Sequence, residues 1–353
     1  MSEATAEPGV LVRVEGRVGR LTLNRPKALH ALDLDMIERM TEALLAWQDD
    51  AAVELVLLDH SGERGFCAGG DIRMLAESAR SGGEAARRFF FAEYRLNELL
   101  HRYAKSVVAI LDGVVMGGGV GISMAARYRV ATERIAYAMP ESGIGLFPDV
   151  GGGWWLSRMP DHIGLWLALT GARIKAADCE LVGVATDYVE SARLPALKAA
   201  IVAEPGAIER LLTEFEGDAG RPPLAQHQDE IARIFAMKSI EGILAALGAA
   251  GTDWSREQLA ALAQKSPQTL KVAFRQLRLA EKIGSFAENM AMEYRIACRV
   301  VVRPDFSEGV RALIIDKDQS PHWDPPSVEG VSETLLDEIF AALPAQQEWS
   351  PLP

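Results

Sequence analysis

The first part of the chain alternates between short apolar runs and amphipathic stretches. Val10–Val14 and Gly19–Leu23 are rich in apolar residues and lie on either side of Gly16, a pattern typical of a β-hairpin. Pro26 ends this element, because proline cannot donate a hydrogen bond to a strand ladder. Asp33 predicts the start of a helix, since short polar side chains cap helix N-termini. The apolar positions of this helix recur at three- to four-residue spacing: Ile37, Met40, Leu44 and Trp47.

Two later runs predict strands that are buried on both faces. Val53–Leu58 and Ser106–Leu111 are almost wholly apolar, as strands are when a sheet is covered on both sides. A helical stretch from Gly83 to about Tyr103 separates them. Beyond the second run the pattern predicts a helix and two short strands: Gly119–Arg127, Tyr128–Ala131 and Ile135–Ala138. This alternation of strands and helices indicates the α/β class.

After about Leu194 the strand signals fade and helical patterns dominate. A surface loop is expected at Gly220–Pro223, and the last residues, Ala345–Pro353, are expected to form a loose tail. The predicted helices are Glu230–Ala250, Ser255–Leu262, Gln268–Ile283, Phe286–Val301 and Val331–Ala342. We therefore expect an α/β core over residues 1–195 and a mainly helical C-terminal region over residues 196–353, packing on the core.

Charge and cysteine content narrow the class of protein. The 353 residues carry a formal net charge of −12, which argues against a general affinity for nucleic acid or for an anionic membrane. No apolar run approaches the roughly 18 residues of a membrane span. Met1–Gly9 lacks the features of a secretory signal or a transit peptide. Three widely spaced cysteines indicate free thiols in a reducing compartment. We expect a cytoplasmic protein without nucleic-acid or membrane partners.

Two glycine-rich turns are the first candidates for chemistry. Phe66–Asp71 contains Gly69 and Gly70, and Met116–Gly121 follows a predicted strand and precedes a helix. Glycine permits unusual backbone angles and lets a backbone N–H approach a ligand closely. Two such N–H donors aimed at one point form an oxyanion hole, which polarises a carbonyl. The alternative is that both clusters are tight strand-to-helix turns without a chemical role.

Two carboxylates stand eight residues apart in an apolar, glycine-rich stretch. Glu141 and Asp149 are placed where carboxylates rarely occur without a partner. Partial burial raises the pKa of a carboxyl group and makes it useful as an acid or a base near neutral pH. The plainer alternatives are that Glu141 starts a turn and that Asp149 caps a helix beginning near Gly151–Trp154.

Several other kinds of site have no support. The chain contains neither the Gly-x-Ser-x-Gly elbow of serine hydrolases nor a Walker phosphate-binding loop. The six histidines show no metal-ligand spacing, so no metal site and no bound cofactor are expected. Cys67 has no histidine nearby in sequence and is interpreted as a packed thiol.

Together these segments resemble the crotonase (enoyl-CoA hydratase/isomerase) superfamily, and within it the subgroup of 3-hydroxyisobutyryl-CoA hydrolases. The resemblance covers almost the whole chain. The matching segments are Asn24–Leu32, Phe66–Arg73, Asp112–Ser123, Ala138–Glu141, Gly145–Gly153 and Phe306–Asp318. It implies a spiral of ββα units followed by a helical C-terminal region, with acyl-CoA as the ligand and a homo-oligomer as one possible assembly.

The resemblance also assigns roles to residues. It places the oxyanion donors at the backbone N–H groups of Gly70 and Gly118. It puts the acyl group near Glu93, Glu141 and Asp149, although the pattern alone would make Glu93 a solvated helical carboxylate. Candidate contacts for coenzyme A are Arg25, Lys27, Ala68, Arg73 and Lys317.

One position favours one reaction over another. Hydratases of this superfamily use two glutamates to add water to a double bond, and the position of the first is occupied here by Gly121. The resemblance therefore implies hydrolysis of an acyl-CoA thioester, with 3-hydroxyisobutyryl-CoA of valine catabolism as the first candidate. Glu141 is expected to act as general base or as nucleophile, with Asp149 assisting. The rival interpretations are an enoyl-CoA hydratase or isomerase and a non-catalytic acyl-CoA-binding protein.

Overall fold

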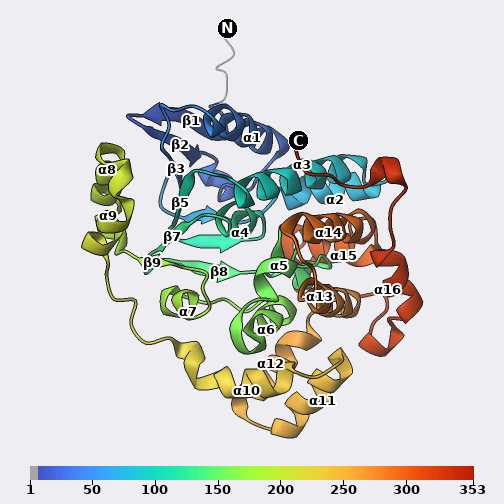
Figure 1. The fold of residues 1–353 in the computed structure, drawn as a ribbon. Coiled ribbons are helices and arrows are strands. Elements are labelled where there is room, and N and C mark those ends of the chain that lie inside the picture. Colours follow the sequence, from blue (N-terminus) through green and yellow to red (C-terminus); the bar gives the residue numbers. More distant parts are fainter. Residues whose placement is uncertain (1–6) are drawn as a thin grey trace. The chain divides into compact units, whose positions relative to one another are not determined.

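A computed structural model describes residues 7–353 of the chain and contains one large sheet and one small one (Figure 1). The first two strands of the large sheet form the predicted antiparallel hairpin, and the later strands are parallel. In spatial order the large sheet consists of β1 (Val10–Glu15), β2 (Val18–Leu23), β3 (Leu55–His60), β5 (Ser106–Leu111), β7 (Tyr128–Ala131) and β9 (Asp187–Tyr188). All six residues of β3 are buried, as its apolar run predicts.

From β3 onward, successive strands alternate between the two sheets. The small sheet consists of β4 (Gly65–Cys67), β6 (Val114–Met116) and β8 (Ala136–Ala138). Each of these follows a strand of the large sheet along the chain, and a helix follows β4 and β6. This repeat confirms the α/β class and the predicted spiral of ββα units.

Contacts divide the chain into two compact units whose segments interleave along the sequence. Among the described residues, the first unit contains residues 7–70, 99–137 and 174–222, and the second contains residues 71–98, 138–173 and 223–353. The sequence predicts an α/β core over residues 1–195 and a helical region over residues 196–353. That division follows composition and not contacts, so it stays a prediction.

The first unit holds the large sheet and the helices that pack on it. Residues of α8 and α9 pack against buried side chains of the sheet such as Leu57 and Ile110, so this helix pair covers one face (Figure 1). The Asp33 side chain accepts a hydrogen bond of 2.9 Å from the Met36 N–H, which confirms the predicted cap of α1. The helices of this unit are α1 (Leu34–Gln48), α4 (Gly118–Ser123), α7 (Ala176–Leu181), α8 (Leu194–Ala203) and α9 (Ile208–Phe215).

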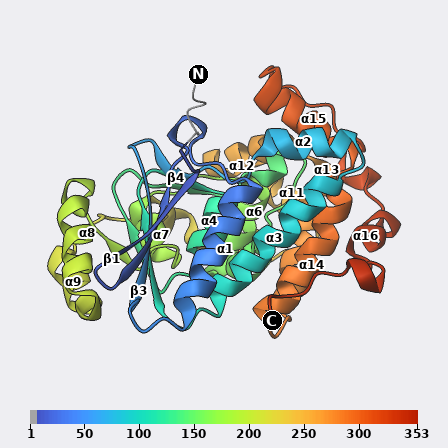
Figure 2. The same ribbon diagram turned by 90° about the horizontal axis from the view of Figure 1, so that it is seen from above.

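The second unit is built almost entirely from helices. In it α3 runs beside α14, as both views show (Figure 2), and the rings of Phe91 and Tyr294 join them. Its helices are α2 (Ile72–Arg80), α3 (Glu84–His101, whose last turn groups with the first unit), α5 (Gly152–Leu156), α6 (Ile163–Thr170), α10 (Gln228–Phe235), α11 (Ile240–Ala250), α12 (Asp253–Ala263), α13 (Pro267–Ala280), α14 (Phe286–Val300), α15 (Pro304–Val310) and α16 (Glu333–Phe340).

Two sequence-based expectations for this region are wrong. The helix predicted over Glu230–Ala250 is two helices, α10 and α11, because Ser239 starts a new helix by accepting a hydrogen bond from the Gly242 N–H. The C-terminal tail is not loose. Trp349 is buried, and its indole N–H donates to the Phe91 carbonyl oxygen at 3.2 Å. The buried indole, together with the Arg295–Glu348 ion pair at 3.0 Å and the hydrogen bond from Arg95 to the Ser350 carbonyl oxygen, anchors a segment whose composition is that of a tail.

Within residues 7–353, no helix combines the length and the apolar character that a membrane-spanning helix requires.

Candidate active site

Parallel pairing of β4 with β6 brings the two glycine-rich turns together inside the first unit. Gly65 pairs with Val114, and the turns leave the two strands at the same end. A Cβ atom built on Gly69 would lie 3.8 Å from the amide nitrogen of Gly118. The pairing of β4 with β6 accounts for this proximity, so the plain-turn alternative stays open beside the oxyanion hole.

The segment that precedes α1 holds the first turn in place. The Ala68 N–H donates to the Leu29 carbonyl oxygen at 3.0 Å, and the Leu32 N–H donates to the Gly69 carbonyl oxygen at 2.8 Å. The buried His30 ring supports this segment by accepting a hydrogen bond of 2.9 Å from the Arg25 N–H at Nδ1. Burial lowers the pKa of His30 to about 4, so the ring is neutral and serves structure.

The second turn depends on glycine for close backbone approach. Gly117 has φ +48° and ψ −123°, and Gly118 begins α4. A Cβ atom on Gly119 would lie 2.5 Å from the Cys67 carbonyl oxygen, so no larger residue fits without displacing β4. Within residues 7–353, the backbone N–H groups of Gly70 and Gly118 donate no hydrogen bond to a backbone carbonyl oxygen. Their assignment as oxyanion donors stays a prediction.

Cys67 lies at the base of these turns and is fully buried. Its thiol contacts the His30 carbonyl oxygen at 3.2 Å. This confirms the interpretation of Cys67 as a packed thiol.

The second unit gathers the three carboxylates. Glu93 lies on α3, Glu141 begins the 3₁₀ helix Glu141–Ile144, and Asp149 lies in the turn before α5. Their exposed fractions are 2%, 5% and 4% respectively. The alternative that Glu93 is a solvated helical carboxylate is therefore wrong, and Glu141 both starts a turn and is buried.

Burial and mutual repulsion shift the protonation of this group. Burial raises the pKa of Glu93 well above its ordinary value, and the charges of Asp149 and Glu141 raise it further. The pKa of Glu141 is raised by the same two causes, burial and the charge of Asp149. Burial raises the pKa of Asp149 to about 7, against a lowering by its hydrogen bond from Tyr94. The cluster thus retains protons at neutral pH that exposed carboxyl groups have lost.

Two oxygens of this cluster have no partner. Glu93 Oε1 and Glu141 Oε2 are buried, and neither accepts a hydrogen bond within the part of the chain that the structure describes. Buried polar atoms in native proteins are nearly always hydrogen-bonded, so such oxygens point to a group from outside the chain.

Asp149 is held by a side chain and does not cap α5. The N-cap of α5 is Gly151, without a side-chain hydrogen bond, so the capping alternative is wrong. The Tyr94 hydroxyl instead donates to Asp149 Oδ2 at 2.9 Å. Periodicity along α3 did not reveal Tyr94, although it follows Glu93 directly.

The turn that carries Asp149 is strained. Val150 has φ +52°, in the left-handed region that β-branched residues rarely adopt. Such a conformation costs on the order of 1–3 kcal/mol and persists only where surrounding contacts impose it.

The contacts around this turn come from residues that sequence reasoning missed. Glu293 on α14 is fully buried and accepts hydrogen bonds from the Gly151 and Gly153 N–H groups. A signal did exist: Glu293 lies on the stripe of the predicted helix Phe286–Val301 that also carries Met290, Ile296 and Val300, where an apolar residue is expected.

The candidate contacts for coenzyme A are scattered. In the first unit Arg25 donates to the Ala31 carbonyl oxygen at 2.6 Å and pairs with Asp33 at 3.1 Å, and Lys27 is exposed. Ala68 is partly exposed in the first turn, and Arg73 and Lys317 are exposed residues of the second unit. Their roles as coenzyme A contacts stay predictions.

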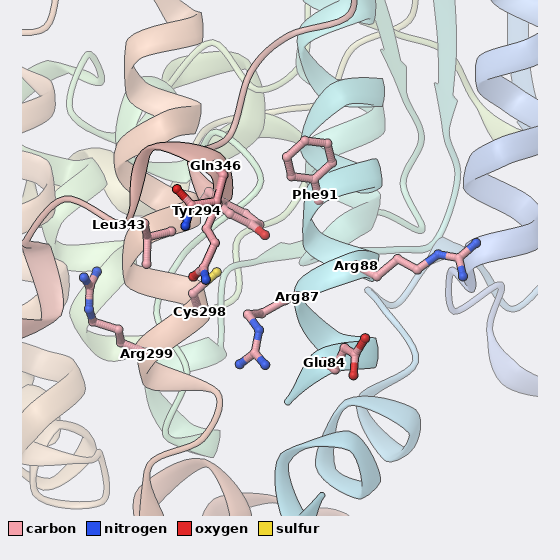
Figure 3. Close-up of a pocket in the computed structure, with 10 residues that line it drawn as sticks. Glu84, Arg87, Arg88, Phe91, Tyr294, Cys298, Arg299, Leu343 and Gln346 are labelled. Atoms are coloured by element: carbon pink, nitrogen blue, oxygen red, sulfur yellow. The ribbon is translucent and has the colours of Figure 1, made fainter. Parts of the chain in front are cut away.

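A separate hollow of about 480 Å³ lies in the second unit (Figure 3). Side chains of α3, of α14 and of residues 343–347 line it, among them Arg87, Phe91, Tyr294 and Cys298. None of the candidate catalytic residues contributes to it. Within residues 7–353, no group of three or more histidine, cysteine, aspartate or glutamate side chains is arranged to hold a metal ion.

The alternation of strands between two sheets, the paired glycine-rich turns and the buried carboxylates are features that can be compared with known proteins. The comparison identifies the family. The family model described as enoyl-CoA hydratase/isomerase matches residues 18–340, and the chain belongs to this family. A protein of Danio rerio named "3-hydroxyisobutyryl-CoA hydrolase, mitochondrial" is 43% identical over 352 residues, which are 97% of this chain and 92% of that protein. The human protein of the same name is 40% identical over 97% of this chain and 91% of its own length.

Solved structures share the whole fold. The structure of a carnitinyl-CoA dehydratase from Mycobacterium thermoresistibile superposes with a TM-score of 0.93 at 39% identity, covering 97% of this chain and 98% of that one. The structure of an enoyl-CoA hydratase from Rhodobacter sphaeroides gives a TM-score of 0.90 at 39% identity, covering 97% and 99%.

The expectation of a cytoplasmic protein is wrong, because the relatives at about 40% identity carry names that place them in mitochondria. Free cysteines and the lack of an apolar span describe any reducing compartment and do not distinguish one from another. Residues 1–6 of the N-terminal segment used for that expectation lie outside the described residues.

Proposed function

We propose that this protein hydrolyses the thioester bond of 3-hydroxyisobutyryl-CoA and releases 3-hydroxyisobutyrate and coenzyme A, a step of valine catabolism. Identity of about 40% over almost the full length to proteins named for this activity supports the proposal. The observation in the chain itself that carries it is Glu141, a buried carboxylate with one oxygen that no described residue satisfies.

The proposed roles follow from what a thioester needs. The N–H groups of Gly70 and Gly118 bind the carbonyl oxygen and stabilise the negative charge that develops on it, a contribution of about 2.7–4 kcal/mol per donor in sites of this kind. Glu93, with its unpartnered Oε1, binds the substrate hydroxyl. Asp149 positions the water or that hydroxyl.

Glu141 starts the reaction in one of two ways. As a general base it takes a proton from water, whose oxygen attacks the carbonyl carbon while the C–S bond breaks and the thiolate leaves. As a nucleophile its ionised carboxylate attacks the carbonyl carbon, the C–S bond breaks, the thiolate leaves, and water then cleaves the resulting anhydride. A single turnover in oxygen-18 water separates the two, because the label enters Glu141 only when an anhydride is hydrolysed at the glutamyl carbon.

The main rival is hydration of an enoyl-CoA, the activity named for one of the similar solved structures. Gly121 speaks against it, because it lies in α4 with no side chain where a hydratase carries its first glutamate. Syn addition of water needs two carboxylates around one water molecule. The remaining carboxylates instead suit attack on a carbonyl.

A thiol-release assay over a panel of acyl-CoA esters tests the proposal. We expect the highest kcat/KM with 3-hydroxyisobutyryl-CoA and stoichiometric free thiol. Loss of enoyl-CoA absorbance without thiol release would instead establish a hydratase, and tight binding of the ester without turnover would establish a binding protein. Sedimentation of the same preparation tests the further expectation of a homo-oligomer.

A further inference from the structure

The backbone of the turn that carries Asp149 is strained, so contacts from other residues must hold it in this conformation. Val150 and Gly151 both have positive φ, +52° and +87°, and the Gly152 N–H closes the turn on the Asp149 carbonyl oxygen at 2.7 Å. A valine in the left-handed region relaxes unless neighbouring groups prevent it. A residue that acts through Asp149 is therefore expected among the side chains that contact this turn.

Glu293 binds the backbone on the far side of the strained residue. Its Oε2 accepts from the Gly151 N–H at 2.7 Å, and its Oε1 accepts from the Gly153 N–H at 2.8 Å. The carboxylate is 0% exposed. A Cβ atom on Gly153 would lie 3.0 Å from Glu293 Oε1, so this glycine is what lets the carboxylate come close.

Gln276 on α13 binds the backbone on the near side. Its amide nitrogen donates to the Pro148 carbonyl oxygen at 2.7 Å and to Glu293 Oε1 at 3.1 Å. Asn289 completes the arrangement by donating to the same oxygen of Glu293 at 2.8 Å. Residues before and after Asp149 are thus tied to one buried carboxylate.

An ordinary helix start does not require such an arrangement. The helix that follows, α5, has five residues, and a hydroxyl or amide side chain from its own turn is the usual cap. Here a buried carboxyl group takes that place, and it comes from a helix 142 residues further along the chain. Burial raises the pKa of Glu293 to about 8, while the four donors around it favour the charged form.

We propose that Glu293, together with Gln276, is a positioning residue that holds residues 148–153 in the strained conformation which orients the Asp149 carboxylate for thioester hydrolysis. Glu293 touches no reacting atom in this proposal. The inference rests on the proposed function, because the role of Asp149 does.

The test compares Glu293→Gln with the wild-type enzyme in the thiol-release assay. Glutamine keeps the shape of the side chain but replaces one acceptor oxygen with an NH₂ group, which faces a backbone N–H donor. We expect kcat to fall about 10- to 100-fold, as displacement of a catalytic group by about 1 Å does, with KM changed less than about threefold. Amide hydrogen exchange of the peptide around Gly151 and Gly153 should become faster. Unchanged kcat or unchanged exchange overturns the proposal.

A double-mutant cycle separates positioning from general destabilisation. With Asp149→Asn already present, Glu293→Gln should lower kcat by less than about threefold, because the group it positions is gone. Equal losses in both backgrounds overturn the proposal. Wild-type kcat in Asp149→Asn alone would refute the role of Asp149 in the proposed function, and the exchange measurement would then still decide whether Glu293 holds the turn.

Two further variants guard against simple unfolding. Gln276→Leu removes the tie to Pro148 and one of the hydrogen bonds to Glu293 but leaves the Glu293 carboxyl group itself in place, and we expect it to lower kcat in the same direction. Asp59→Asn is the matched control, because Asp59 is a fully buried carboxylate of β3 paired with Arg20 at 2.7 Å and Lys198 at 3.0 Å. It should lower the melting temperature and leave kcat within about twofold. If Gln276→Leu folds and retains wild-type kcat, the proposal fails.

Discussion

The Tyr94 hydroxyl donates a hydrogen bond of 2.9 Å to Asp149 Oδ2, joining α3 to a turn 55 residues further along the chain. The phenol remains a donor at every accessible pH, because burial and the charge of Asp149 raise the pKa of Tyr94 well above its ordinary value. The same hydrogen bond lowers the pKa of Asp149, which burial raises, and the balance lies at about 7. The hydrogen bond from Tyr94 therefore offsets part of the effect of burial on the pKa of a proposed catalytic group.

Tyr94→Phe should move the pH profile of hydrolysis upward. Below about pH 7 Asp149 is protonated, and if its ionised form is needed, kcat rises with pH through that value. Loss of the phenolic donor raises the pKa of Asp149 further, so the inflection should move to higher pH. The measurement is kcat from pH 5 to pH 9. Tyr103→Phe, which removes a hydrogen bond of 2.7 Å to the Leu44 carbonyl oxygen, is the control and should leave the inflection in place.

Asp149→Asn should stabilise the fold at alkaline pH while reducing activity. In the folded state the pKa of Asp149 is raised from 3.8 to about 7, so between these values the folded chain holds a proton that the unfolded chain has lost. Stability therefore falls as pH rises through this window, and the penalty is complete above about pH 7. Melting temperatures of variant and wild type should agree near pH 4 and differ by a few degrees at pH 8. A variant less stable than wild type at pH 8 would contradict the raised pKa.

Glu141→Gln should remove hydrolysis while sparing ligand binding. Glutamine is close to glutamate in shape but can neither accept a proton from water nor attack a carbonyl, so kcat should fall by about 10²–10⁴-fold. Calorimetric titration with coenzyme A should give an unchanged dissociation constant. Turnover within tenfold of wild type would rule out Glu141 as the group that starts the reaction.

Gly119→Ala should destabilise the first unit. The added methyl group would lie 2.5 Å from the Cys67 carbonyl oxygen, so β4 and α4 must separate. Overpacking of this kind typically costs about 1–3 kcal/mol. Gly248→Ala is the matched control, since nothing lies within 4 Å of its added Cβ inside α11. That change should stabilise the chain by about 0.5–1 kcal/mol, because alanine favours a helix interior. Urea unfolding of the two variants shows whether the signs differ.

Trp349→Ala tests whether the C-terminal segment is part of the fold. Its indole is 5% exposed and donates to the Phe91 carbonyl oxygen, two residues from Glu93. Removing a buried tryptophan side chain typically costs about 3–5 kcal/mol. Limited proteolysis should then cleave the segment after Leu343 faster than in the wild type. Equal cleavage rates would show that the segment is loose, as its composition suggested.

Sequence reasoning succeeded where the physical cause is local. The hairpin at Gly16, the cap at Asp33 and the buried run in β3 each depend on neighbouring residues, and the structure has all three. The fold class followed from the order of strands and helices, and the family from long motifs.

The misses are contacts between segments far apart in the chain. The Asp149 turn is contacted by Tyr94, Gln276 and Glu293 only after the chain has folded. Neither periodicity nor motif spacing in the sequence predicts such partners. The buried state of Glu93 has the same origin, because a helix face is buried by what packs on it. Apolar spacing continues across Ser239 and therefore predicts one helix over Glu230–Ala250. In the structure the Ser239 side chain caps a second helix, which begins at Ile240.

The hydrogen bonds between Glu293 and the Asp149 turn also order events during synthesis of the chain. Gly151 leaves the ribosome 142 residues ahead of Glu293, and synthesis proceeds at roughly 5–20 residues per second. During that interval the carboxyl group that contacts the turn is absent, so nothing from α14 holds Val150 at the φ of +52° that it has in the folded chain. If Glu293 positions Asp149 as proposed, a nascent or truncated chain carries the proposed oxyanion donors and Asp149 without the geometry to use them, and we expect activity only after α14 has been made and docked.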